Sequence, residues 1–163
     1  MSVIDALVRS NEVYAKQHGD MLPPRPAKRL AVLTCMDARL DVYRLLGLAE
    51  GDAHVLRNAG ATVTDDVIRS LAVSQRLLDT NEILAISHTD CGMRTFSDEE
   101  FRSDLERQTG HRPPWPSEEF RDPEADVRAS IARIKDSPFV PHTEGVRGFV
   151  FDVGTGRLRE VTV

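Results

Sequence analysis

Two short segments carry residue types that can bind a metal ion. One runs from Cys35 to Arg39 and the other from His88 to Gly92, and together they hold both cysteines of the chain. Two thiolates and one imidazole form a ligand set that suits zinc, and three protein ligands are usual where a fourth position stays open for water or substrate. The residue types at Cys35, His88 and Cys91 therefore favour an open zinc site.

Both segments directly follow apolar runs that are typical of buried strands, at residues 30–33 and 83–86. In a parallel sheet, the carboxyl ends of neighbouring strands line a common crevice, where ligand-binding groups collect. Cys35 can therefore meet His88 and Cys91 in space, although a long stretch of chain separates them. A His-x-x-Cys spacing alone is a weak signal, and the second cysteine at a matching strand end strengthens it.

The cysteines have two other interpretations, a disulfide bond or two unrelated buried thiols. A disulfide bond is disfavoured because nothing in the sequence points to an oxidising compartment. The first ten residues carry charges too early for the apolar core of a signal peptide, and no stretch is long and apolar enough to span a membrane. We therefore expect a cytoplasmic protein with reduced thiols.

The length and the charge of the chain limit its architecture and its partners. Its 163 residues predict one domain, residues 1–163, in which residues 1–28 form an N-terminal arm and linker. The formal net charge is -5 and the pI is near 5.5. An acidic chain gains little from contact with nucleic acid or with an anionic membrane surface, so neither is an expected partner.

Strand-like and helix-like segments alternate along the chain, which predicts an α/β fold with a mostly parallel sheet flanked by helices. Thr64 is a good N-cap for an amphipathic helix that continues to Leu78, and Gly47 can end a short helix that starts at Leu40. The other expected elements are a strand at 54–58, helices at about 94–107 and 124–135, and a C-terminal β-hairpin from 148–153 and 158–163.

Two segments do not fit this alternation. Residues 108–123 are rich in proline and predict an irregular excursion or a lid. Residues 4–17 have weak helical apolar spacing and precede the proline-rich segment 23–26. A helix there does not easily belong to the sheet core, so we expect an N-terminal helix that extends to a partner subunit.

Three motifs resemble those of the β-class carbonic anhydrases, most closely the short bacterial members. They are Cys-x-Asp-x-Arg at residues 35–39, Arg-Asn-Ala-Gly at residues 57–60 and His-x-x-Cys-Gly at residues 88–92. The close resemblance covers residues 31–93, and the order of the elements extends it more loosely to the C-terminus. The resemblance implies a zinc-dependent enzyme that reversibly hydrates carbon dioxide to bicarbonate and a proton.

The resemblance also implies roles for single residues. Cys35, His88 and Cys91 would bind one zinc ion per chain, which lowers the pKa of its bound water towards about 7 and so supplies hydroxide for attack on carbon dioxide. Asp37 would accept a hydrogen bond from this hydroxide, and Arg39 would keep Asp37 ionised and in place. In some family members this aspartate moves at lower pH and takes the fourth zinc position.

Several of these residues also have a structural interpretation. Asp37 and Arg39 can form an ordinary ion pair that caps the following helix. Gly92 is implied to contact the substrate through its backbone N–H, and its alternative is a plain turn glycine. Arg57 and Asn58 are interpreted as structural first.

The resemblance has one departure and one consequence for assembly. Plant-type members use a glutamine shortly before the first strand to contact bicarbonate, and residues 22–29 contain none, so the substrate pocket here is built differently. In the family, each active site lies at a subunit interface that an N-terminal helix reaches across. We therefore expect a homodimer or a higher homo-oligomer.

Three functions remain open at this point. The first is carbon dioxide hydration. The second is hydrolysis of carbonyl sulfide or carbon disulfide on the same zinc site, because relatives act on these substrates of similar shape. The third is a non-catalytic protein that zinc stabilises, and the missing fourth Cys or His ligand weighs against it.

Overall fold

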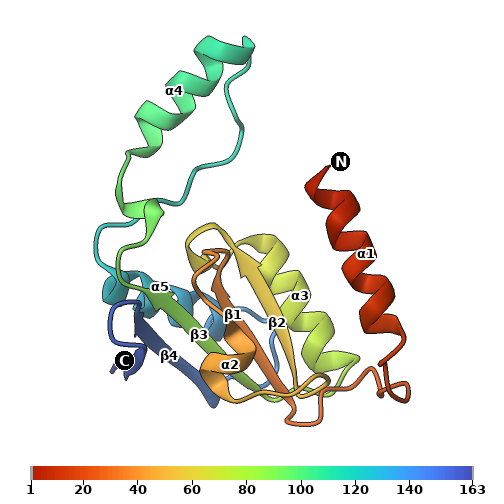
Figure 1. Ribbon diagram of the computed structural model, residues 1–163. Helices are drawn as coiled ribbons and strands as arrows, with labels where there is room; N and C mark the ends of the chain where they lie inside the picture. The colour runs from red at the N-terminus through yellow and green to blue at the C-terminus, as the bar shows by residue number, and fades with distance from the viewer. Residues whose placement is uncertain (1, 163) are drawn as a thin grey trace.

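A five-stranded sheet forms the centre of the computed structural model, which describes residues 2–162 (Figure 1). The strand order is β2-β1-β3-β4-β5, in which the first four strands run parallel and β5 is antiparallel to β4. The strands are β1 (Leu30–Cys35), β2 (Ala53–Asn58), β3 (Glu82–His88), β4 (Gly145–Asp152) and β5 (Arg157–Glu160). The prediction of a mostly parallel α/β sheet is therefore confirmed.

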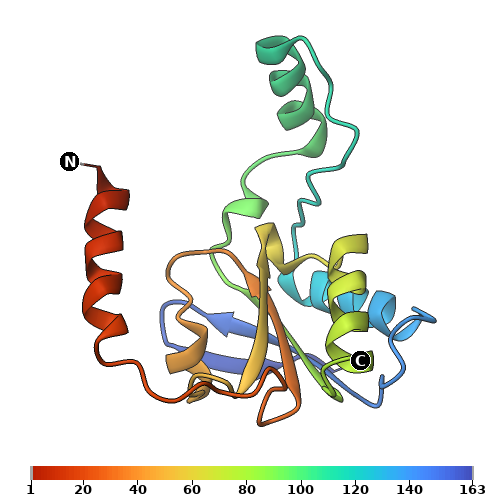
Figure 2. The same cartoon turned by 90° about the vertical axis from the view of Figure 1, so that its right-hand side faces the viewer.

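Helices cover both faces of this sheet (Figure 2). α3 (Asp65–Arg76) and α5 (Pro123–Lys135) pack on one face, and the short α2 (Val42–Leu46) packs on the other. Side chains of β1 alternate between these two layers, since Leu33 joins the α3 and α5 side and Val32 joins the α2 side. A central strand that is buried on both faces needs apolar residues throughout, which explains the continuous apolar run in the sequence.

The predicted helix ends are largely those observed. Thr64 caps α3 by accepting a hydrogen bond from the backbone N–H of Val67 at 3.4 Å. Gly47 ends α2 in the left-handed conformation, with a φ of 65° that favours glycine. The start of α2 was predicted too early, because Asp41 caps this helix by accepting from the backbone N–H of Arg44 at 3.3 Å.

The helix predicted at about 94–107 is shifted along the chain. A single 3-10 turn, η2 (Gly92–Arg94), comes first, and α4 spans Asp98–Thr109. Ser97 fixes this start because its hydroxyl accepts from the backbone N–H of Glu100 and donates to the Glu100 carboxylate at 2.7 Å. The Ser-x-x-Glu spacing at 97–100 is a known helix-start signal that could have placed this boundary correctly.

Two helices project from the body of the molecule (Figures 1 and 2). α1 (Val3–Ala15) and α4 have no buried residue, and each stands away from the sheet. An extended segment, residues 16–29, joins α1 to β1, and residues 110–122 return from α4 without regular secondary structure. No helix within residues 2–162 combines the length and the apolar character needed to cross a membrane.

A buried carboxylate in α5 makes the stability of the fold depend on pH. Burial, together with the negative charge of Glu118, raises the pKa of Asp126 from 3.8 to about 6. Oδ2 of Asp126 has no hydrogen-bond partner among the described residues. A carboxylate whose pKa is raised in the folded state stabilises the fold below its unfolded pKa and loses that contribution as the pH rises through about 6.

Asp126→Asn should therefore raise the free energy of unfolding at pH 8 by about 1 kcal/mol, after allowance for partial exposure and for the lost helix-dipole contact. The gain should shrink as the pH falls from 8 to 4, because the aspartate itself becomes neutral. Urea unfolding at the two pH values measures both effects. Asp20→Asn, at an exposed position in the linker, should change neither value.

Candidate metal centre

The carboxyl ends of β1 and β3 bring the first two candidate ligands together. β1 ends at Cys35 and β3 ends at His88, and the two strands are direct parallel neighbours in the sheet. Cys91 follows three residues after His88, immediately before η2. Asp90 turns the chain back towards the sheet through a left-handed conformation with a φ of 55°.

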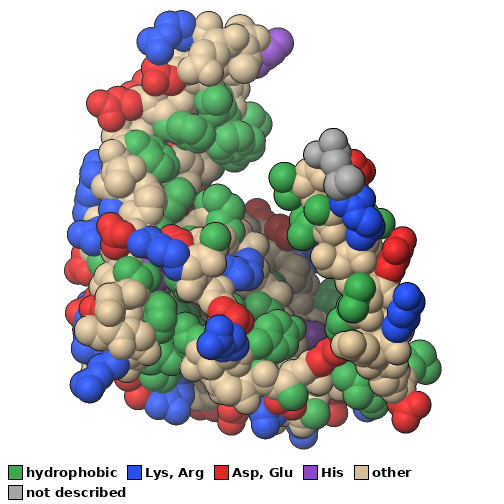
Figure 3. Space-filling view, in the orientation of Figure 1, with side chains coloured by type: hydrophobic (Ala, Val, Ile, Leu, Met, Phe, Trp, Pro, Cys, Tyr) green, Lys and Arg blue, Asp and Glu red, His purple; other side chains and the backbone are tan. Residues whose placement is uncertain are grey.

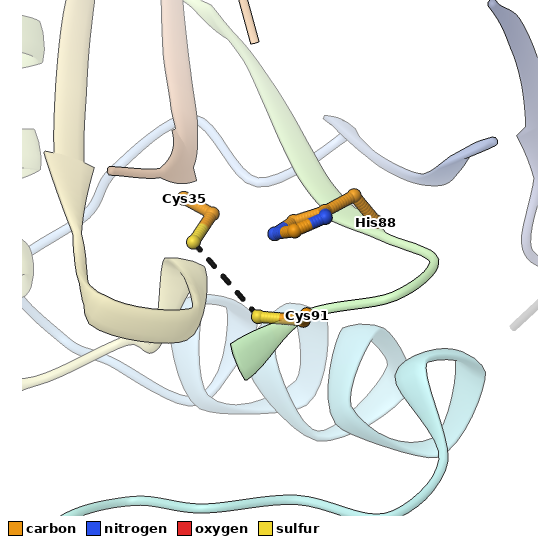
Figure 4. A group of neighbouring side chains, drawn as sticks. All are labelled: Cys35, His88 and Cys91. Carbon is orange, nitrogen blue, oxygen red and sulfur yellow. Dashed lines mark hydrogen bonds between the residues drawn. The ribbon is translucent and has the colours of Figure 1, made fainter. Parts of the chain in front are cut away.

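The three side chains converge on one point (Figure 4). The ligand atoms of Cys35, His88 and Cys91 all lie within 4.8 Å of one another, and the two Sγ atoms are 4.0 Å apart. Each residue is less than 5% exposed. Both cysteines are free, since a disulfide bond needs sulfur atoms about 2 Å apart. The predicted meeting of the three residues is therefore what the fold produces.

The orientation of His88 fits a bound metal ion. Its Nδ1 lies 2.8 Å from the backbone carbonyl of Thr89, which can only accept, so Nδ1 carries the proton and Nε2 keeps a lone pair. Nε2 is buried and has no hydrogen-bond partner within residues 2–162. An imidazole nitrogen left in that state costs free energy, and a cation held between the two sulfur atoms would satisfy it. The Cys-His-Cys group is thus a metal-binding site.

The surroundings of the two thiols separate their pKa values. Burial raises the pKa of Cys35, but the positive charge that the adjacent His88 ring carries when it is protonated, together with the backbone N–H groups of Asp37 and Gly60, outweighs burial and lowers the pKa to about 7. Burial and the neighbouring Cys35 raise the pKa of Cys91 to about 11. Cys35 therefore ionises readily near neutral pH, while Cys91 needs a cation beside it to become a thiolate ligand.

Asp37 and Arg39 form a bidentate ion pair beside the Cys35, His88 and Cys91 side chains. Nε of Arg39 donates to Oδ1 of Asp37 at 3.0 Å, and a terminal nitrogen donates to Oδ2 at 2.8 Å. These bonds, with a third from the backbone N–H of Arg39, hold the pKa of Asp37 well below its usual range. Oδ2 of Asp37 also lies 3.8 Å from Nε2 of His88, so the carboxylate borders the metal-binding group.

The Arg-Asn-Ala-Gly motif holds the first ligand segment in place. Arg57 donates to the backbone carbonyl of Cys35 at 3.0 Å and to that of Asp37 at 2.6 Å. The backbone N–H of Met36 donates to the carbonyl of Asn58 at 2.8 Å. These contacts support the structural interpretation of Arg57 and Asn58.

Gly92 was predicted to belong to the site from the sequence, and Asp90 was not. Gly92 begins η2, with open space on the side where a Cβ would point, and its predicted contact with substrate stays a prediction. Asp90 was not among the predicted site residues, although its carboxylate accepts a hydrogen bond from Arg39 at 2.7 Å. The position of Asp90 between His88 and Cys91, two candidate ligands, was the feature of the sequence that could have indicated a role at the site.

An apolar cavity of about 440 Å³ adjoins the site. Met36, next to Cys35, and Met93, near Cys91, both line it. The other lining residues include Asn58, Thr62, Phe96, Phe101, Trp115 and Glu118. Such walls accept a small uncharged molecule more readily than a charged one.

The fold and the site together define a class of protein. Within residues 2–162 the metal-binding group offers three protein ligands, and the Asp37–Arg39 carboxylate–guanidinium pair borders it. Structural zinc sites are usually closed by four protein ligands, whereas a site with three leaves a position for chemistry. The molecule therefore has the architecture of an α/β metalloenzyme.

Comparisons with known proteins identify the family. The family model described as Carbonic anhydrase matches residues 30–115. The chain is 55% identical to Beta-carbonic anhydrase 1 of Mycobacterium tuberculosis, over 99% of each chain. It superposes on the crystal structure of carbonic anhydrase from Streptococcus mutans with a TM-score of 0.93 and 47% identity, covering 99% of both. This chain belongs to the β-carbonic anhydrase family.

A more distant group of relatives has a different name. The chain is 33% identical to a protein named Carbon disulfide hydrolase from Acidianus sp., over 96% of this chain and 88% of the relative. The family therefore includes proteins named for two substrates of similar shape, and the higher identity lies with the carbonic anhydrases.

Proposed function

We propose that this protein catalyses the reversible hydration of carbon dioxide to bicarbonate and a proton, with one zinc ion per chain held by Cys35, His88 and Cys91. The observation that carries the proposal is the buried group of three ligand atoms within 4.8 Å of one another, beside the Asp37–Arg39 pair. Two sulfur atoms and an imidazole nitrogen select zinc over harder cations such as magnesium and calcium. Bound there, zinc would supply the Lewis acidity that brings the pKa of a water molecule towards about 7.

The residues of this chain would orient the reacting groups. Asp37, kept ionised by Arg39, presents Oδ2 towards the metal-binding group and can accept a hydrogen bond from the attacking oxygen. That bond aims the remaining lone pair of the oxygen at the carbon of the substrate. The apolar cavity beside Met36 and Met93 would hold uncharged carbon dioxide, and the backbone N–H of Gly92 is the proposed contact to a substrate oxygen.

Stopped-flow hydration of carbon dioxide, with zinc content measured on the same sample, tests this function directly. We expect about one zinc per chain and catalysis at pH 7 to 9. A fully zinc-loaded protein with no hydration activity at any pH in this range would overturn the proposal.

Hydrolysis of carbon disulfide or carbonyl sulfide is the alternative activity. Its support is the 33% identity to proteins named Carbon disulfide hydrolase, together with an apolar cavity that suits either substrate. The same zinc-loaded sample, assayed for release of hydrogen sulfide, separates the two activities. A non-catalytic, zinc-stabilised protein would show full occupancy and neither activity.

We also propose that the protein works as a homodimer in which α1 packs against a second copy. Apolar side chains of α1 are exposed, with Ile4 at 71% and Leu7 at 63%. Figure 3 shows hydrophobic side chains on α1 and on the facing side of the α4 projection, with a hollow between them. On the α4 side, Phe101 and Trp115 line the apolar cavity, with their ring centroids 6.4 Å apart and the ring planes tilted by 41°. Each copy thus has an uncovered apolar helix and an uncovered apolar groove.

Placing a charge on this face of α1 should break the assembly. We expect the double variant Ile4→Asp, Leu7→Asp to run as a monomer in light scattering at micromolar concentration, because two buried carboxylates would cost several kcal/mol at the interface. Glu12→Gln, on the same helix, should leave the mass of the dimer unchanged. A wild-type protein that is already monomeric would contradict the proposal.

A cytoplasmic location is part of the same proposal. Two free thiols at the centre of the site favour a reducing compartment, where they remain available as metal ligands.

A further inference from the structure

Two edges of the Arg39 guanidinium are hydrogen-bonded. One edge binds the Asp37 carboxylate, through Nε and one terminal nitrogen. The other edge binds Asp90, whose carboxylate oxygen accepts at 2.7 Å and whose backbone carbonyl accepts at 2.8 Å. Four of the five N–H groups that an arginine offers are therefore used by two residues.

Asp90 reaches Arg39 through an uncommon backbone conformation. Its φ of 55° lies in the left-handed region, which aspartate and asparagine adopt more readily than most residues. Asp90 also lies in the turn between His88 and Cys91, two of the candidate metal ligands. The contact with Arg39 therefore ties the segment after β3 to the segment after β1.

We propose that Asp90 is a positioning residue that fixes Arg39 and, through Arg39, the carboxylate of Asp37. This inference rests on the proposed function of the site. Within residues 2–162, every hydrogen bond to the Asp37 carboxylate comes from residue 39, at 2.8 to 3.0 Å. Whatever holds Arg39 therefore also holds Asp37.

The geometry gives Asp37 little distance to travel if this support is lost. Oδ2 is already 3.8 Å from Nε2 of His88, so a small displacement would carry the carboxylate into the metal-binding group. The side chain of Arg39 is 47% exposed, and a long arginine side chain has many rotamers to sample. The second anchor at Asp90 restricts those rotamers to the one that keeps Asp37 beside the site.

Two substitutions separate this role from the formation of the turn. Asp90→Gly keeps the left-handed turn, because glycine adopts it freely, but removes the carboxylate that binds Arg39. Asp90→Asn keeps both the turn and an oxygen acceptor. We expect kcat for carbon dioxide hydration to fall about 3- to 10-fold in D90G with KM nearly unchanged, since one charge-assisted hydrogen bond at an exposed site is lost, and D90N to recover most of kcat.

A spectroscopic readout makes the test independent of turnover. The protein is loaded with Co²⁺ in place of zinc, and its visible absorption reports the ligands around the ion. We expect the D90G spectrum to change because Asp37 enters the coordination sphere, while metal content stays at about one per chain. A D90G protein with the wild-type spectrum and wild-type kcat would overturn the proposal, and so would D90G that fails to retain the metal, since Asp90 would then support the ligands instead of Asp37.

A matched control exists elsewhere in the chain. Asp79 also has a left-handed φ, of 67°, and its carbonyl and carboxylate accept from Arg29 at 2.9 and 3.1 Å. D79G removes the same kind of clamp at a distance from the site, and should change neither kcat nor the Co²⁺ spectrum. If the wild-type protein proves inactive, the proposed function fails while the Co²⁺ comparison of D90G with D79G still decides the role of Asp90.

Discussion

Cys91→Ser should leave a folded protein that retains almost no zinc and has no measurable carbon dioxide hydration. Changes to residues that only support a metal ligand already cost about 10- to 100-fold in affinity, so the loss of a ligand should cost more than about 100-fold. Serine nearly preserves the volume of Cys91 in its buried position, which is only 3% exposed. The expected defect is therefore in the binding of metal and not in the packing of the core.

Zinc content after dialysis and the thermal midpoint with and without a chelator measure this effect. The wild-type midpoint should fall when zinc is removed, because a ligand that binds only the folded state stabilises it by about 2.7 kcal/mol at 100 times its dissociation constant. The C91S midpoint should not respond to the chelator. Ser87→Ala, near the end of β3 and also buried, is the control and should keep the metal. A C91S protein with a full zinc complement would show that Cys91 is not a ligand.

The sequence predicted this centre well because its residues depend on regular elements. Cys35 and His88 are the last residues of two strands with continuous apolar runs, which clearly indicate buried strands. Two neighbouring parallel strands end at the same edge of the sheet, whatever the length of the chain between them. The end of α2 at Gly47 and the start of α3 at Thr64 could also be predicted from local sequence. Each depends on one residue, the left-handed conformation of Gly47 or the capping hydroxyl of Thr64.

The contacts between turns were harder to predict. Asp90 meets Arg39 from a turn in which its own φ is positive. The position of Asp90 between two candidate ligands suggested a role at the site, but the sequence could not show the positive φ or the contact with Arg39. Arg57 likewise acts on the backbone carbonyls of Cys35 and Asp37, which every residue has, so its partners could not be named from side-chain types. The directions in which α1 and α4 project could not be predicted from local sequence either, because neither helix has a buried residue that packs it against the sheet.

Asp37→Asn should separate catalysis from the binding of metal. The amide keeps the shape of the side chain but carries no negative charge, and its NH₂ group would face the donors of Arg39. We expect kcat to fall about 10²- to 10³-fold, the usual effect of removing a positioned acid–base or hydrogen-bonding group, with zinc content unchanged.

The alternative interpretation, an ion pair that only caps the next helix, predicts a different result. An exposed pair contributes about 0 to 1 kcal/mol, so D37N would then lower the free energy of unfolding slightly and leave kcat intact. Asp66→Asn breaks such a pair, since Asp66 contacts Arg69 at 2.8 Å in the first turn of α3, and serves as the control for both measurements. The side chain of Asp37 is only 17% exposed and points at His88, whereas that of Asp66 is 74% exposed, so the two substitutions should diverge in kcat far more than in stability.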